Sequence, residues 1–253
     1  MKAAVPAATS FRDSSSSPLD KTVVVRYYTN VGIKAVGFDL DGTLYPAWLM
    51  YAVSADICIR HPRLLRAYST ARRVMRSREF SAGADPSEPF KTRQASMIAR
   101  SLGADPKTVA KAIDTTIYAV IEKRFCLIRP FKGAAACLGS LREAGLKLGL
   151  LSDLPPAKKI GLLGLNSFFD SMLCSEDFGA LKPDPRPFAA LAQALSTPPE
   201  SILYVGNNKE YDILGAKAAG MQTALVSRRK NPTADFTFQA WDELRDWVLV
   251  RQA

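Results

Sequence analysis

The sequence predicts an α/β fold, in which helices cover a parallel sheet and a helical domain is inserted after the first core strand. Two observations predict it. Short apolar, β-prone runs alternate with helix-like stretches from residue 129 onward, which is typical of parallel strands joined by crossover helices. The interval between the first two such runs has helical periodicity and no strand pattern. A Rossmann-like core with a helical cap follows from these two features.

The core strands are the short runs that alternate with helical stretches. Gly145 and Gly220 each follow a predicted helix, where glycine commonly forms the C-terminal cap. Because helices separate the later strands, we expect a parallel sheet that is covered on both faces. The predicted strands are 35–40, 146–152, 169–174, 201–206 and 222–227, and the predicted helices between the later ones are 133–144, 157–164, 185–195 and 209–219.

The two ends of the chain differ in character. Residues 1–20 are rich in Ala, Ser and Pro, so we predict a disordered leader there. Thr22–Tyr28 is β-prone and fits an edge strand or an extended lead-in. At the other end, Phe238–Val248 has the pattern of a closing amphipathic helix. The Rossmann-like core is therefore expected to comprise residues 21–46 and 129–253.

The interval 47–128 is predicted to be the inserted helical cap. Its periodicity is interrupted at His61-Pro62 and at Gly83–Pro89, and about four or five helices fit between these breaks. That length is too great for a crossover connection between neighbouring strands. We therefore expect a separate helical domain above the carboxyl ends of the strands.

Composition narrows the class of protein. The chain has 253 residues, and 34 basic against 24 acidic side chains give a net charge of +10, which favours anionic partners. No run of about 18 apolar residues is present, so no membrane-spanning helix is expected. The N-terminus lacks the apolar core of a signal peptide, and the four cysteines form no CxxC pair. These features favour a cytoplasmic protein without a disulfide framework or a zinc site.

Two acids mark the end of the first core strand. The run VGFDLDGTLYP at 36–46 places Asp39 where the apolar residues stop and Asp41 in the turn that Gly42-Thr43 demands. Ligands of open α/β sheets bind at the carboxyl ends of the strands. Two acids at that place can act as nucleophile and as general acid/base. Taken alone, they are also compatible with a pair of solvated turn residues.

Three further residues occupy equivalent strand ends. Ser152 follows the run LGLL, Lys182 lies in ALKPDP, and Asp212 lies in VGNNKEYD. Each has an ordinary interpretation: a strand-end serine, an exposed loop lysine, and an acid favoured at a helix N-terminus. Their functional interpretation depends on their occurring together.

This set of residues resembles the haloacid dehalogenase (HAD) superfamily of phosphohydrolases. The resemblance covers roughly 34–46 and 127–228, and all four motifs of the superfamily occur in order. It implies that Asp39 is the nucleophile and that Asp41 protonates the leaving oxygen and later activates water. Lys182 would neutralise the transferring phosphoryl group. Thr43, Ser152 and Asp153 would bind the substrate.

The resemblance also implies a Mg²⁺ cofactor. Its ligands would be Asp39, the backbone carbonyl of Asp41, and Asp212, since Mg²⁺ prefers hard oxygen ligands. The fourth motif usually begins Gly-Asp, and this chain has Asn207 at the position of that acid. Because an amide oxygen is neutral, we expect a weaker metal site. Asp153 replaces the Asn that often follows the serine of the second motif.

The inserted interval is strongly basic. Between Arg60 and Arg100, basic side chains outnumber acidic ones by seven, and Arg72, Arg73 and Arg76 recur at helical spacing. Either these arginines form a solvated helix face, or part of that face attracts a polyanionic substrate, nucleic acid or an acidic membrane surface. The residues expected either to line the pocket or to pack at the hinge are Tyr45, Trp48, Leu49 and Tyr51.

The function that we expect is Mg²⁺-dependent hydrolysis of a small phosphate monoester through an aspartyl-phosphate. The expected partner is a small phosphorylated metabolite, such as phosphoglycolate, a sugar phosphate or a nucleoside monophosphate. Two alternatives stay open. A 2-haloacid dehalogenase would share the fold and nucleophile, but Asp41 argues against it. A catalytically weak binding or regulatory protein is compatible with Asn207 and with the basic helices.

Overall fold

The structure of the protein, a computed structural model, describes residues 31–77, 79–80 and 87–252. Gly32–Ala253 forms one compact unit. The predicted leader at 1–20, the β-prone stretch Thr22–Tyr28 and the greater part of the predicted break at Gly83–Pro89 lie outside the described residues.

The core is a parallel sheet with the strand order β3-β2-β1-β4-β5-β6. All neighbouring strands pair in parallel, and the first strand lies in the middle, between β2 and β4. This arrangement confirms the predicted α/β Rossmann-like fold. The strands are β1 (Ala35–Phe38), β2 (Lys147–Ser152), β3 (Ser171–Cys174), β4 (Ile202–Gly206), β5 (Gln222–Val226) and β6 (Phe236–Phe238).

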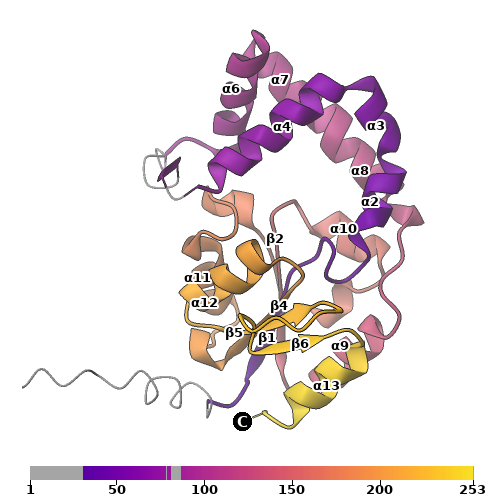
Figure 1. Cartoon of the computed structure of the whole chain (residues 1–253), viewed down its shortest axis with the longest axis vertical. Helices are drawn as coiled ribbons and strands as arrows, with labels where there is room; N and C mark the ends of the chain where they lie inside the picture. Colours follow the sequence, from indigo (N-terminus) through magenta and orange to yellow (C-terminus); the bar gives the residue numbers. More distant parts are fainter. Residues whose placement is uncertain (1–30, 78, 81–86, 253) are drawn as a thin grey trace, which may run out of the picture. The chain divides into compact units, whose positions relative to one another are not determined.

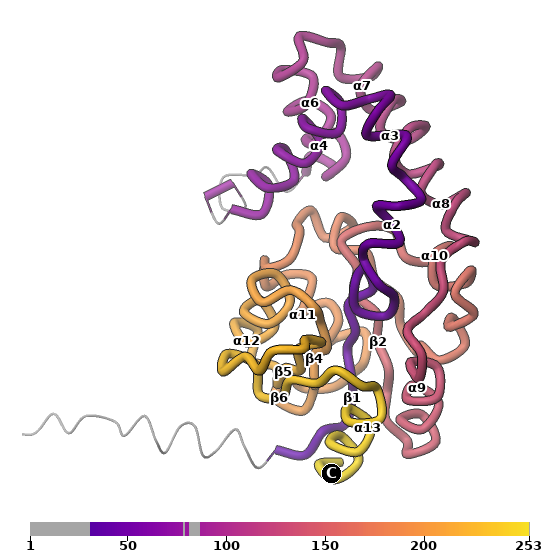
Figure 2. The backbone as a smooth tube through the Cα atoms, turned by 45° about the vertical axis from the view of Figure 1, so that its right-hand side comes forward, coloured from indigo at the N-terminus to yellow at the C-terminus, as the bar shows by residue number. Residues whose placement is uncertain are grey.

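Helices cover both faces of the sheet, as Figures 1 and 2 show. Val36 and Phe38 of β1 belong to a buried cluster shared with α9 (Ala134–Glu143), α10 (Ala157–Leu162) and α13 (Trp241–Leu249). Ala35 belongs to a second cluster, shared with α11 (Pro185–Ala194) and α12 (Leu214–Ala218). Alternate side chains of a strand point to opposite faces, so β1 is apolar throughout because both its faces are buried.

The C-terminal segment differs from the prediction. The helix expected from Phe238 begins instead at Trp241, and Phe238 ends the strand β6. Phe236 and Phe238 lie on one face of β6 with their rings stacked 6.1 Å apart, and Asp235 upstream accepts hydrogen bonds from Thr223 of β5. A strand this short offers too few residues for alternation to be recognised.

Between β1 and β2 the described residues are largely helical, and we call the helices within Ala47–Leu127 the inserted helices. Their break at His61-Pro62 is present, since α3 ends at Arg60 and α4 begins at Pro62. Tyr68, Ile98 and Ile113 belong to a buried cluster of the inserted helices' own. The helices are α2 (Ala47–Val53), α3 (Ala55–Arg60), α4 (Pro62–Met75), α6 (Phe90–Leu102), α7 (Pro106–Ala112), a π-helical turn (Ile113–Tyr118), α8 (Ala119–Arg124) and a 3-10 turn (Phe125–Leu127).

No helix within the described ranges has the length and apolar character that crossing a membrane requires. Cys137 and Cys174 are buried, whereas Cys58 and Cys126 are exposed, and all four are free thiols.

Candidate active site

Asp39 follows directly on the central strand of the sheet. Its backbone N–H donates to the carbonyl of Val205 on β4 (2.9 Å), which holds the residue at the carboxyl end of β1. The residue is 6% exposed, and the hydroxyl of Thr43 donates to its Oδ2 at 2.7 Å. Thr43 thus contacts Asp39 from within the same turn. The other oxygen of the Asp39 carboxylate, Oδ1, accepts from a different donor.

That donor is Lys182, whose Nζ contacts two carboxylates. Nζ lies 2.7 Å from Asp39 Oδ1 and 2.7 Å from Asp212 Oδ1, and 3.1 Å from the hydroxyl of Tyr204. Burial lowers the pKa of Lys182, but Asp212 and Asp39 more than offset this and hold that pKa well above its ordinary value. Lys182 therefore stays an ammonium. It comes just before α11, where the side chain of Asp184 caps the helix at Arg186 N.

Asp212 is brought to the strand ends by the turn that follows β4. The side chain of Asn208 accepts from the backbone N–H groups of Glu210 and Tyr211 at 2.9 Å each. Asp212 Oδ2 in turn accepts from the N–H groups of Asn207 (3.2 Å) and Asn208 (3.0 Å). A Cβ on Gly206 would lie 2.3 Å from the Cβ of Asp212, so only glycine lets Asp212 approach the strand so closely.

Asn207 lies against the turn that carries the two acids. It is exposed, and its Oδ1 accepts from Thr43 at 3.3 Å. Gly42 has a positive φ of +94°, and a Cβ on it would lie 2.3 Å from Asn207 Nδ2. Glycine at 42 therefore serves two needs, the left-handed backbone of the turn and the space for the Asn207 amide.

Asp41 contacts a separate set of donors. Tyr45 donates from its hydroxyl to Oδ1 (2.5 Å), and Ser152 Oγ lies 3.4 Å from Oδ2. Lys159 Nζ lies 2.6 Å from Oδ1 and 2.7 Å from Oδ2. Burial raises the pKa of Tyr45, with the Asp41 carboxylate acting in the same direction, so the phenol keeps the proton that it donates.

Sequence reasoning did not find Lys159. It is 2% exposed, on the first turns of α10. The neighbouring Lys158 is exposed and pairs with Glu122 at 3.0 Å, and the sequence offers no signal that distinguishes the two lysines. Only the tertiary structure shows that one of them points to Asp41.

The structure thus brings the predicted Asp39, Lys182 and Asp212 into one ion-pair cluster and places Asp41 and Ser152 in contact beside it. Burial raises the pKa of Asp39 to about 7; Lys182 opposes this shift, whereas Asp212 and Asp41 add to it. Three carboxylates thus share two ammonium groups in this cluster.

These residues fit a bound divalent cation by their chemistry. The donors at this place are carboxylate and amide oxygens, the ligands that Mg²⁺ prefers, and the cluster has an excess of negative charge. Within the described ranges, no three His, Cys, Asp or Glu side chains are grouped as metal ligands. The predicted metal ligands stay a prediction.

Asp153 connects this cluster to the inserted helices. Its Oδ1 accepts from the backbone N–H of Lys182 at 3.1 Å, and its Oδ2 pairs with Arg76 at 2.7 Å. Arg76 also donates to the carbonyl of Lys182 at 3.2 Å. Arg72 donates to the Asp153 carbonyl at 2.7 Å and pairs with Glu176 at 2.5 Å. The expectation of a solvated arginine face is therefore wrong for Arg72 and Arg76, which turn inward, while Arg73 is exposed.

We expect Arg76→Met to lower the free energy of unfolding by about 1–3 kcal/mol, because it removes charge-assisted hydrogen bonds to a partly buried acid. Burial would raise the pKa of Asp153, but Lys182, Arg76 and Arg72 hold it below its ordinary value. The stabilisation is therefore present above the unfolded pKa of about 4 and is lost as the pH falls through the folded pKa. Urea unfolding at neutral and acid pH measures both effects.

The exposed Arg73→Met is the matched control for Arg76→Met, since it removes the same side chain from the last turn of α4, just before the cap residue Arg76. We expect it to change the free energy of unfolding by less than about 0.5 kcal/mol. Equal losses in the two variants would contradict a specific role of Arg76 at Asp153.

The four aromatic and apolar candidates after the first strand separate into distinct roles. Tyr45 is buried and contacts Asp41. Leu49 is partly buried against the core cluster, as hinge packing requires. Trp48 and Tyr51 are 65% and 71% exposed. Neither of these two lines the cavity beside α6 or the small one beside α10.

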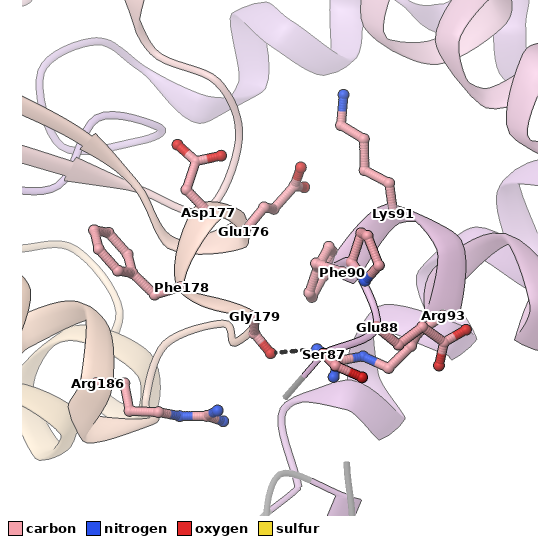
Figure 3. A pocket seen from close by; sticks show the side chains of 11 residues that line it. Ser87, Glu88, Phe90, Lys91, Arg93, Glu176, Asp177, Phe178, Gly179 and Arg186 are labelled. Atoms are coloured by element: carbon pink, nitrogen blue, oxygen red, sulfur yellow. Dashed lines mark hydrogen bonds between the residues drawn. The ribbon is translucent and has the colours of Figure 1, made fainter. Parts of the chain in front are cut away.

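A cavity of about 490 Å³ lies between α6 and the 3-10 turn Ser175–Phe178. Figure 3 shows Lys91, Arg93 and Arg186 around it, and Arg93 donates to the Gly179 carbonyl at 2.6 Å. None of the predicted site residues lines this cavity. It is therefore distinct from the carboxylate–lysine cluster.

Comparison with known families and relatives agrees with this geometry. The family model described as haloacid dehalogenase-like hydrolase matches residues 33–220. The glyceraldehyde 3-phosphate phosphatase of Methanopyrus kandleri is 31% identical over 201 residues, which are 78% of this chain and 85% of that protein. The phosphoglycolate phosphatase of Haemophilus influenzae is 27% identical over 236 residues, or 87% of this chain and 95% of that protein.

A solved structure has the same fold. The L-2-haloacid dehalogenase from Xanthobacter autotrophicus with chloropropionic acid covalently bound superposes with a TM-score of 0.61 and 21% identity. The match covers 85% of this chain and 98% of that one. At this identity the likeness establishes the fold and leaves the reaction open.

Proposed function

This chain belongs to the haloacid dehalogenase-like hydrolase family and is a phosphoric monoester hydrolase, and we propose that it hydrolyses a small phosphate monoester through a phosphorylated Asp39. The observation that carries the proposal is the separation of the two acids. Asp39 pairs with Lys182, whereas Asp41 pairs with Lys159. Two acids in different environments can take the different roles of nucleophile and proton carrier.

The proposed reaction proceeds in two steps. Asp39 attacks the phosphorus, and Asp41, in its protonated form, gives its proton to the departing alcohol oxygen, which leaves an aspartyl-phosphate and an Asp41 carboxylate. Asp41 then takes a proton from water, which attacks the phosphorus and frees Asp39. Lys182 lies 2.7 Å from the attacking carboxylate, where its charge stabilises the negative charge on the phosphoryl oxygens. Ser152 is at the end of β2, in reach of the same group.

The metal that the family implies fits the donors described above. Asp39, Asp212 and the backbone carbonyl of Asp41 would hold Mg²⁺, and Asn207 would offer an amide oxygen. When bound, Mg²⁺ supplies positive charge that offsets the charge of the phosphoryl group. Burial raises the pKa of the Asp39 carboxyl group. The positive charge of a bound Mg²⁺ would favour the ionised form of this group.

The substrate class that we propose is a small phosphorylated metabolite, of the kind named in the two relatives: a triose phosphate, phosphoglycolate or a similar phosphate. The inserted helices contact Asp153 and Lys182 through Arg76. We propose that residues 47–128 form a cap over the core of 21–46 and 129–253 and exclude bulk water and macromolecular phosphates.

A phosphate-release screen tests this proposal. Purified protein is incubated with glyceraldehyde 3-phosphate, phosphoglycolate, sugar phosphates and nucleoside monophosphates, with Mg²⁺ and with a chelator. We expect Mg²⁺-dependent release from one or more of them. Release from none of them, and none from p-nitrophenyl phosphate, would favour the second candidate, a catalytically weak binding protein, for which Asn207 at a ligand position is the supporting observation.

Asn207→Asp is expected to lower the Mg²⁺ concentration for half-maximal rate by about tenfold, because ligand charge tunes the affinity of oxygen-ligand sites over decades. The measurement is a Mg²⁺ titration of phosphate release. Asn208→Asp is the control, since it adds the same charge one residue along, on a side chain that caps the turn. Equal shifts in both variants, or no shift in the first, would mean that residue 207 is not a metal ligand.

A further inference from the structure

Lys159 is a buried cation that the two-step reaction above does not use. Its ammonium contacts both oxygens of Asp41, at 2.6 and 2.7 Å, and is 2% exposed. It lies 5.8 Å from the centre of the Phe125 ring. A buried ammonium is costly unless it is paired, and Asp41 is the acid with which Lys159 forms an ion pair. The ion pair therefore fixes both side chains relative to each other.

The contacts of Asp41 leave little freedom for its side chain. Tyr45 donates to Oδ1, Ser152 lies near Oδ2, and Lys159 bridges the two oxygens. These donors come from the turn after β1, the end of β2 and the start of α10. Lys159 Nζ makes the shorter contact to Oδ2, at 2.7 Å, whereas Ser152 Oγ lies 3.4 Å from it. Without Lys159, the side-chain contacts left to this carboxylate among the described residues would be that of Tyr45 and the longer one of Ser152.

We propose that Lys159 is a positioning residue, which holds the Asp41 carboxyl group in the orientation from which it serves the departing oxygen. The proposal rests on the proposed phosphatase function. It assigns no proton transfer to Lys159 itself. The loss of Lys159 would let Asp41 rotate away from the departing oxygen, while Asp39 and Lys182, held by a separate ion pair, would keep their places.

This role has a signature that general damage to the fold lacks. An alkyl alcohol needs a proton as it leaves, whereas p-nitrophenolate departs readily as an anion. The ratio kcat/KM includes only the steps up to the first irreversible one, which is the departure of the alcohol. A misplaced Asp41 should therefore lower kcat/KM for an alkyl phosphate and spare it for p-nitrophenyl phosphate.

The experiment compares Lys159→Met with wild type on glyceraldehyde 3-phosphate, phosphoglycolate and p-nitrophenyl phosphate. On whichever alkyl phosphate the wild type hydrolyses, we expect kcat/KM to fall by about a hundredfold, which is the usual size of a general-acid contribution. On p-nitrophenyl phosphate we expect kcat/KM to fall by less than about threefold. Lys158→Met is the matched control and should match wild type on all of them. If Lys159→Met does not fold, Lys159→Gln, which keeps an N–H donor, should show the same selectivity at about tenfold.

A double-mutant cycle with Asp41→Asn tests whether Lys159 acts through Asp41. In that background Lys159→Met should cause no further loss on the alkyl phosphate. Equal losses on alkyl and aryl substrates, no loss on either, or a full further loss in the Asp41→Asn background would each overturn the inference. Failure of the proposed function would look different. The wild type would then release no phosphate, or its release would be unchanged in Asp39→Asn.

Discussion

Asp39→Asn is expected to reduce phosphate release by about 10⁴-fold or more, because the variant lacks the nucleophile and must rely on direct attack by water. The amide keeps the size of the carboxylate and can still accept from Thr43, which donates at 2.7 Å in the wild type. Initial rates with p-nitrophenyl phosphate and with the best metabolite of the screen measure the effect.

The Asp39→Asn variant should fold, since strand β1 is held by apolar contacts on both faces. Circular dichroism and thermal melting check this. Asp246→Asn, at a side chain that is 66% exposed on α13, is the matched control and should keep the wild-type rate. A variant at position 39 that is folded and as active as wild type would refute the assignment of Asp39 as nucleophile.

Lys182→Met is expected to lower the rate by about 10²–10³-fold, the usual cost of removing one preorganised donor from a developing charge. It should also lower the free energy of unfolding by about 3–5 kcal/mol, because Asp39 and Asp212 lose a buried partner. The pKa of Lys182 is raised, so its stabilisation is present throughout the neutral range. It is lost only as the pH rises above the unfolded value of about 10.4.

The two effects of Lys182→Met are measured by initial rates and by urea unfolding at pH 7. Lys217→Met serves as control, because Lys217 forms a surface ion pair with Asp235 at 2.9 Å and such pairs contribute about 0–1 kcal/mol. An active Lys182→Met enzyme with wild-type stability would contradict the central position that we give to Lys182.

The sequence is sufficient to predict that Asp39, Ser152, Lys182 and Asp212 lie along one edge of the sheet. Each lies at the end of a strand or after it, and in a parallel sheet the strands place their carboxyl ends along one edge. The order in which β2, β1 and β4 lie side by side then decides which of these side chains meet. Periodicity alone does not give that order, and it is the structure that shows which of these side chains meet.

The contacts that the sequence did not predict all join distant segments. Lys159 and Lys158 have the same local pattern, and only the packing of α10 makes one buried and the other exposed. Arg72 and Arg76 have a helical spacing, which shows that they share a face and does not show where that face points. Strand β6 was missed because it has three residues.

The most direct test of the account is to identify the phosphorylated residue. Enzyme is mixed with substrate, quenched in acid within one turnover, and digested for mass spectrometry of the peptide that contains residues 36–46. We predict one added phosphoryl group on Asp39 in wild type and none in Asp39→Asn. Phosphate release without any phosphorylated Asp39, or with the group on another residue, would contradict the mechanism.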